Sequence, residues 1–141
     1  MAVLYPSNEW CEEWKKAINN SPKCAEKGKV WGVDFNGSFV FELLPSDGLT
    51  QKTYVYLDTK GGKALESRII NDLSEVDAGF ICPGQYGEYK KVAKGEEDFI
   101  EGLLRGHFTL KGDMAKIMRN AQFVRGLADS ISSFESEYLG E

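Results

Sequence analysis

Apolar residues recur at two different spacings along this chain, at steps of three and four near both ends and at every second position in the middle. Near the N-terminus the wider spacing covers residues 7–20 and predicts a helix with one apolar face. Ser7 stands where it can cap this helix, and Ser21-Pro22 marks its end. The apolar face consists of Trp10, Cys11, Trp14 and Ile18. We expect this face to pack in the core, although tryptophan can also face a partner or a ligand.

The alternating middle of the chain predicts antiparallel strands. Residues 30–44 are typical of a hairpin, because Asn36-Gly37 can form a type I′ turn between two alternating runs. Two further strands are expected at 53–59 and 64–70, on either side of the turn at 60–63. The connections are too short for crossover helices, so the four runs predict a meander. The hairpin residues that share a face are Trp31, Val33 and Phe35 in the first run and Phe39, Phe41 and Leu43 in the second.

The second half of the chain mixes short strands with helices. A short strand is expected at 77–82, followed by a helix at 85–94 that ends at Gly95 and a helix at 97–105. Residues 106–111 then predict a last strand, which places Phe108 and Leu110 on one side. His107, Thr109 and Lys111 fall on the other side of that strand, where we expect them to face solvent.

The longest periodic run begins at Asp113, which stands where it can cap a helix. Apolar residues recur from there to Tyr138, and a helix over 113–139 would be about 40 Å long. Gly126 could kink or divide this helix. Its apolar stripe contains Met114, Ile117, Met118, Ala121, Val124, Leu127, Ala128, Ile131, Phe134 and Tyr138.

Composition excludes several classes of protein. A chain of 141 residues predicts a single domain over 1–141. No apolar run is long enough to span a membrane, and no secretory signal is visible, so a cytoplasmic location is expected. The formal net charge of −5 disfavours nucleic acid as a partner. The three cysteines form no CxxC pair, which predicts buried, unreactive thiols and no metal site.

No arrangement of reactive residues demands catalysis. A phosphate-binding loop needs several glycines at fixed spacing, and here only Gly112 precedes the acidic Asp113. His107 is the only histidine and has no evident nucleophile beside it. The carboxylates show no pairing that general acid–base chemistry would require. We therefore expect no catalytic residues, and the alternatives are a filled hydrophobic core and an apolar ligand cavity.

The segment from Tyr89 to Met118 resembles the lipid-binding domain of the sterol carrier protein-2 (SCP-2) family. That family carries an aromatic-x-x-apolar-x-x-Gly helix, which Tyr89, Val92 and Gly95 match. Eleven residues after Gly95, the segment 106–113 matches the family's Gly-x-apolar-x-apolar-x-Gly-(Asp/Asn) pattern. Asp98 stands where the family often has Asp or Asn, although Phe99 replaces the proline that follows. The chain ends without the Ser-Lys-Leu peroxisomal signal.

The resemblance implies an α+β fold with a five- or six-stranded, largely antiparallel sheet, covered on one side by helices and completed by the long C-terminal helix. It also implies non-catalytic binding of a lipid, such as a fatty acid, an acyl-CoA or a sterol- or isoprenoid-like molecule, in an apolar tunnel without a cofactor. Transient membrane contact and a homodimer are compatible with it, whereas stable membrane insertion is not expected. From alternation and helix faces, we expect the tunnel to be lined by Phe39, Phe41, Tyr54, Tyr56, Phe80, Phe99, Leu103, Phe108, Leu110, Met114, Ile117, Met118, Val124, Leu127 and Ile131.

Two other functions remain open from the sequence. The first is an interaction or regulatory module with a filled core, which would bind a partner through the edge of the meander or the final helix. The second is a small isomerase with an apolar pocket that uses Asp or Tyr together with His107.

Overall fold

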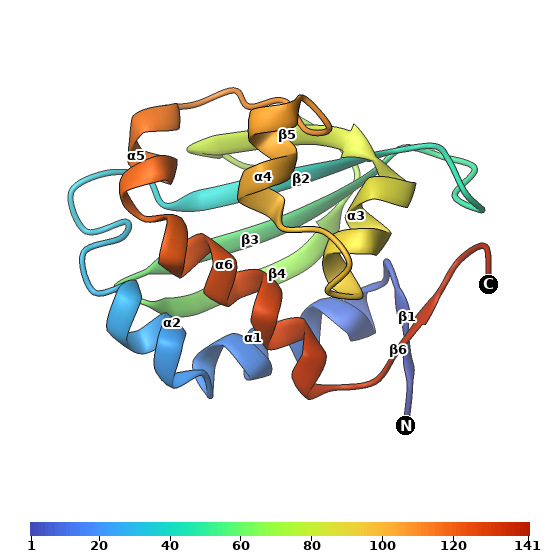
Figure 1. The fold of residues 1–141 in the computed structure, drawn as a ribbon, viewed down its shortest axis with the longest axis horizontal. Coiled ribbons are helices and arrows are strands. Elements are labelled where there is room, and N and C mark those ends of the chain that lie inside the picture. The colour runs from blue at the N-terminus through green and yellow to red at the C-terminus, as the bar shows by residue number, and fades with distance from the viewer.

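A four-stranded sheet carries most of the helices on one face (Figure 1). The structure is a computed structural model and describes residues 1–141. The strand order is β4-β3-β2-β5, antiparallel except for the parallel pair β2 and β5. A separate two-stranded sheet pairs β1 with β6 in parallel and brings the two ends of the chain together. The elements are β1 (Val3–Tyr5), α1 (Asn8–Asn19), α2 (Pro22–Lys27), β2 (Ser38–Leu44), β3 (Thr53–Lys60), β4 (Lys63–Ile70), η1 (Leu73–Glu75), β5 (Phe80–Gln85), α3 (Tyr86–Ala93), α4 (Phe99–Arg105), α5 (Met114–Arg119), α6 (Ala121–Asp129), η2 (Ser130–Ser133) and β6 (Ser136–Tyr138).

The two faces of the main sheet are covered differently. The face that carries α1, α3, α4 and α6 in Figure 1 holds a core of 29 buried residues. The opposite face holds only a small buried cluster of Val40, Tyr56 and Ile70, together with side chains from the segment around η1. A ligand cavity enclosed by helices therefore has to lie on the first face. No helix in the structure is both long and apolar enough to cross a bilayer.

The predicted first helix is confirmed. The Ser7 side chain accepts a hydrogen bond from the Trp10 amide at 3.0 Å and caps α1. The four residues of its predicted apolar face are all buried. Ser21-Pro22 does end α1, but Ser21 also caps the short helix α2, which the sequence analysis missed.

The predicted hairpin over residues 30–44 is wrong in its first half. Only 38–44 form a strand, while the chain before it turns back at Gly32, whose φ is +75°. The Trp31 indole is fully buried, and its Nε1 donates to the Gly37 carbonyl at 3.0 Å. The Asn36 carboxamide oxygen accepts from the Ser38 amide at 3.0 Å, so Asn36 supports this loop instead of forming a hairpin turn. Burial of one indole and its hydrogen bond thus overrides the local alternation.

The other predicted strands and short helices are confirmed with shifts at their ends, except for the last strand. The strand expected at 77–82 is β5, which starts three residues later and continues through Pro83-Gly84 to Gln85. Residues 106–111 form no regular strand and contact β5 only through two isolated bridges, Ile81–Lys111 and Gly84–Phe108. The main sheet consequently has four strands, instead of five or six, and it is largely antiparallel as expected.

The segment predicted as one long C-terminal helix forms two α-helices, a short 3-10 helix and a strand instead. Asp113 caps α5 as expected, since its carboxylate accepts from the Ala115 amide at 2.9 Å. The helix breaks at Asn120, whose amide nitrogen and side chain both bond to the Lys116 carbonyl. Gly126 lies inside α6, where a side chain would meet the Cys24 sulfur at 3.1 Å, so it permits close packing against α2 and forms no kink.

Beyond α6 the chain leaves the helical path. The Ser130 and Ser133 hydroxyls donate to the carbonyls of the residues three positions earlier, at 2.7 and 2.8 Å. Such bonds compete with helical hydrogen bonds. The last residues of the predicted helix accordingly form η2 and then β6, which pairs with the N-terminal strand.

Candidate ligand cavity

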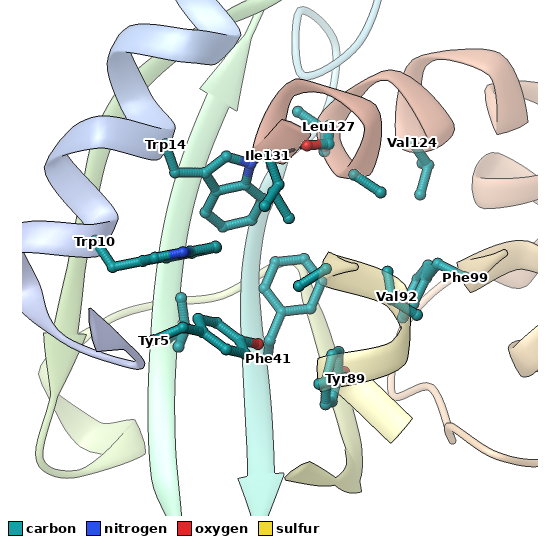
Figure 2. A pocket seen from close by; sticks show the side chains of 13 residues that line it. Tyr5, Trp10, Trp14, Phe41, Tyr89, Val92, Phe99, Val124, Leu127 and Ile131 are labelled. Atoms are coloured by element: carbon teal, nitrogen blue, oxygen red, sulfur yellow. Dashed lines mark hydrogen bonds between the residues drawn. The ribbon is translucent and has the colours of Figure 1, made fainter. Parts of the chain in front are cut away.

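An entirely apolar cavity lies between the main sheet and the helices that cover it (Figure 2). Its wall is built by elements from the whole length of the chain, from β1 near the start to η2 near the end. All thirteen lining residues are hydrophobic: Tyr5, Trp10, Trp14, Phe41, Val55, Tyr89, Val92, Ala93, Phe99, Val124, Leu127, Ala128 and Ile131. We call this space the cavity.

The spacing of residues along helices and strands brings these side chains to the cavity. Trp10 and Trp14 lie one turn apart on α1, and their rings stand 5.1 Å apart, so they form one continuous edge of the wall. On the sheet, Phe41 and Val55 face each other across the β2–β3 pair. Figure 2 shows the Phe41 ring between these tryptophans and the side chains of α3. The floor and one side of the cavity are therefore aromatic.

The polar side-chain atoms of Trp10, Trp14 and Tyr89 are hydrogen-bonded within the protein. The Trp14 Nε1 donates to the Leu127 carbonyl at 2.8 Å, and the Trp10 Nε1 donates to the Ser136 hydroxyl at 2.9 Å. The Tyr89 hydroxyl donates to the Cys82 carbonyl. Burial raises the pKa of Tyr5 and of Tyr89 well above the ordinary tyrosine value, so both phenols stay neutral. The wall offers apolar contact and no charged group.

The cavity is small in this structure. Its volume is about 40 Å³, enough for about three water molecules at roughly 10–15 Å³ each. An engineered cavity that admits benzene measures about 150 Å³. A space of this size does not hold a long-chain lipid with the covering helices where they are, and we call this arrangement the closed form.

Five of the residues expected from the sequence lie on the cavity wall, namely Phe41, Phe99, Val124, Leu127 and Ile131. Several others are buried in the core beside the cavity without lining it. Phe39 and Phe80 pack on Trp31, and Phe108 packs on Phe99 at a ring distance of 5.0 Å. Leu103 and Ile117 are also buried in this core, and Leu110 and Met118 are half-buried at its margin.

Three expected residues lie elsewhere. Tyr54 and Tyr56 point to the opposite face of the sheet, where Tyr56 belongs to the small second cluster. Met114 is exposed on α5. The alternating run 53–59 has apolar residues on both faces, and the side that includes Val55 is the one that meets the cavity.

Eight lining residues were not among those expected: Tyr5, Trp10, Trp14, Val55, Tyr89, Val92, Ala93 and Ala128. Five of them carried a signal in the sequence, and one of these, Ala128, belongs to the apolar stripe of the predicted C-terminal helix. Trp10 and Trp14 stood on an apolar helix face, and Tyr89 and Val92 belong to the motif that resembles the SCP-2 family. Tyr5 lies in β1, whose pairing with β6 joins residues at opposite ends of the chain and leaves no local pattern.

A solvent-facing recess adjoins the cavity, and we call it the vestibule. It has a volume of about 430 Å³ and lies between α6 and residues 92–99, which comprise the end of α3, the α3–α4 connection and the start of α4. Val92, Ala93, Phe99 and Ala128 line both spaces, so these four side chains form the partition between them. The remaining vestibule residues are Lys94, Gly95, Glu96, Glu97, Asp98, Arg125, Asp129 and Ser132.

His107 lies outside the cavity, in a surface cluster with Glu88 and Glu97. Its Nδ1 contacts a Glu97 carboxylate oxygen and lies 3.4 Å from Glu88 Oε2. Burial raises the pKa of Glu97, while a hydrogen bond shared with Glu97 lowers the pKa of Glu88. These side chains are of the kinds that bind divalent cations. The His107 side chain is 40% exposed, in keeping with the predicted solvent-facing position, and it does not line the cavity.

Comparison with solved structures identifies the fold. A crystal structure of sterol carrier protein 2 matches with a TM-score of 0.79 over 91% of this chain and 97% of that chain, at 21% sequence identity. The chain has the SCP-2 fold. A conserved hypothetical protein of Thermus thermophilus, described as a candidate sterol carrier protein, matches with a TM-score of 0.81 over 100% of this chain and 97% of that chain, at 19% identity. The apo form of sterol carrier protein 2 from Yarrowia lipolytica matches with a TM-score of 0.55 over 93% and 98% of the two chains, at 14% identity.

Comparison of the sequence with known families and proteins gives less information than comparison of the structure. No family model matches the chain. A curated relative, the tRNA modification GTPase MnmE of Campylobacter concisus (strain 13826), is 26% identical over 132 residues, which cover 89% of this chain. The chain spans only 28% of the length of that relative. It contains no GxxxxGK[ST] loop, the phosphate-binding motif that GTPase chemistry of the P-loop kind requires.

Proposed function

We propose that this protein binds a lipid non-catalytically, with the acyl, sterol or isoprenoid portion in the cavity. The observation that carries the proposal is the composition of the wall, which is hydrophobic at all thirteen positions. The two tyrosines of the wall stay protonated, so the wall offers neither a general base nor a nucleophile at neutral pH. It can bind apolar chains, and the SCP-2 fold of the chain supports a lipid as the ligand.

Binding has to open the closed form. Each CH₂ group removed from water contributes about 0.8 kcal/mol, so a chain of about twelve carbons gives roughly 9–10 kcal/mol before costs. Loss of ligand freedom and displacement of the covering helices reduce this value. Micromolar affinity, which corresponds to about 8 kcal/mol, is compatible with these terms. We propose that the protein acts as a cytoplasmic carrier that contacts membranes transiently while it loads or releases its ligand.

The first test is native mass spectrometry of the purified protein, followed by organic extraction. We expect a mass excess of one lipid per chain, which extraction removes and identifies. A clean mass for the bare chain, combined with no uptake of added lipid, would overturn the proposal and favour an interaction module with a filled core. Mass spectra at several concentrations would also test whether a homodimer forms.

Two matched substitutions test whether the lipid binds in the cavity. Ala128 is half-buried in the partition, so Ala128→Phe places a ring there with room to tilt toward solvent. Ala115→Phe makes the same change at an exposed position on α5. We expect the first variant to lose at least tenfold in lipid affinity and the second to keep the affinity of the parent protein. Equal affinities in the two variants would exclude entry through the partition.

A further inference from the structure

The vestibule contains more negative than positive side chains. Its lining includes four carboxylates, at Glu96, Glu97, Asp98 and Asp129, and two cations, at Lys94 and Arg125. The two spaces share four lining residues, so the vestibule is the polar region next to the apolar cavity. A lipid whose chain fills the cavity from this side would leave its polar end among these charges.

Neither cation is free to bind an anionic group. Arg125 donates to both carboxylate oxygens of Asp98, with three contacts of 3.1–3.2 Å. Lys94 Nζ donates to Glu141 at 2.6 Å. Glu96, in contrast, is exposed and forms no ion pair. Asp129 and Glu97 contact Lys23 and His107, which lie outside the lining of the vestibule. A carboxylate or phosphate in the vestibule would therefore meet the unpaired charge of Glu96, and it could gain a cationic partner from the lining only by breaking an existing ion pair.

We propose that the polar end of the bound lipid lies in the vestibule and that the charges there select an uncharged hydroxyl or ester over a carboxylate or phosphate. Among the lipids considered above, this favours sterol-, alcohol- and isoprenoid-like molecules over free fatty acids and acyl-CoA. The inference rests on the proposed function, because it requires a lipid in the cavity.

The selectivity can be measured with two ligands of equal chain length. Trp10 and Trp14 line the cavity, so tryptophan emission reports its occupation. We expect dodecanol to bind at least fivefold more tightly than laurate at pH 8 and low salt, with the difference shrinking as salt screens the charges. Laurate binding as tight as that of dodecanol would overturn the inference and leave lipid binding intact. Failure of both ligands to bind would overturn the proposed function as well.

Two matched variants separate the vestibule from the overall charge of the protein. Glu96→Lys changes the lining from four carboxylates and two cations to three of each. Glu26→Lys makes the same charge change at an exposed position on α2, outside the vestibule. We expect Glu96→Lys to raise the affinity for laurate severalfold relative to the affinity for dodecanol, and Glu26→Lys to leave the ratio of the two affinities unchanged. Equal effects of the two variants would mean that net charge, and not the vestibule, sets the preference.

Discussion

The indole nitrogen of Trp14 donates a hydrogen bond to the carbonyl oxygen of Leu127 at 2.8 Å, joining α1 to α6 across the cavity. The two residues are 113 positions apart in the sequence. The bond is buried, and both side chains line the wall. It therefore holds α6 in its closed position over the sheet, and a ligand that displaces α6 has to strain or break it.

Trp14→Phe should weaken this closure. Phenylalanine retains an aromatic ring but loses the donor and some volume, so we expect a loss of about 2 kcal/mol in the free energy of unfolding. The amides of α6 should also exchange faster with solvent. Chemical denaturation and hydrogen exchange would measure both effects.

Trp31→Phe is the matched control for that change. Trp31 is also buried and donates to a carbonyl, but it does not line the cavity. Trp31 packs on Phe123 near the start of α6, with the ring centres 5.6 Å apart. We therefore expect a similar loss of stability, with any faster exchange confined to the start of α6 and none around Leu127. If both variants changed α6 alike, the Trp14–Leu127 bond would have no special role in closure.

Substitutions on β3 distinguish the two faces of the sheet. Val55→Phe adds volume inside a cavity of about 40 Å³ and should lower lipid affinity at least tenfold. Overpacking should also cost about 1–3 kcal/mol of stability. Tyr54→Phe, at the neighbouring position on the other face, should alter neither property appreciably. Lipid titrations of the two variants test the placement, which fails if Tyr54→Phe reduces the affinity.

The three cysteines should be inert in the folded protein, in line with the sequence expectation. All are free and have essentially no exposed surface. Burial raises the pKa of Cys11 to about 11 and that of Cys82 to about 12, and it raises the pKa of Cys24 as well. Because the thiolate is the reactive form, iodoacetamide at pH 8 should label none of them until denaturant is added. Labelling of Cys24 alone in native buffer would instead reveal local opening between α2 and α6.

The sequence predicted those features that depend on neighbours in the chain. The apolar face of α1 and the caps at Ser7 and Asp113 are set within one helical turn, and each is present in the structure. The fold of residues 30–37 is not local, because it depends on placing the Trp31 indole in the core. The orientation of β3 was equally ambiguous, since apolar side chains occupy both of its faces and alternation alone cannot select one.

The cavity wall could also be predicted only in part, because it depends on contacts between residues far apart in the sequence. Residues from eight elements meet there, and the β1–β6 pairing that brings Tyr5 to the wall joins the two ends of the chain. A helix stripe identifies which residues are buried, but not which of them border an empty space. That distinction depends on how the elements pack together, so the sequence could indicate five lining residues and could not separate them from the filled core around Phe39 and Phe80.

The cluster of Glu88, Glu97 and His107 should make stability depend on pH. Burial raises the pKa of Glu97 above its unfolded value of about 4.3, so the folded state binds a proton that the unfolded state has released. The stability from this group is complete below the unfolded pKa and declines as pH rises through the higher folded pKa. The pKa of Glu88 is instead lowered, to below the unfolded value of about 4.3. The stability from Glu88 is therefore complete above the unfolded pKa and declines as pH falls through the folded pKa. Glu97→Gln keeps the shape and removes the titration, so melting temperatures should fall less steeply than in the parent protein as pH rises above the unfolded pKa of about 4.3. Glu96→Gln, at the adjacent exposed position, should retain the original slope, and a parallel change in both variants would refute the assignment to Glu97.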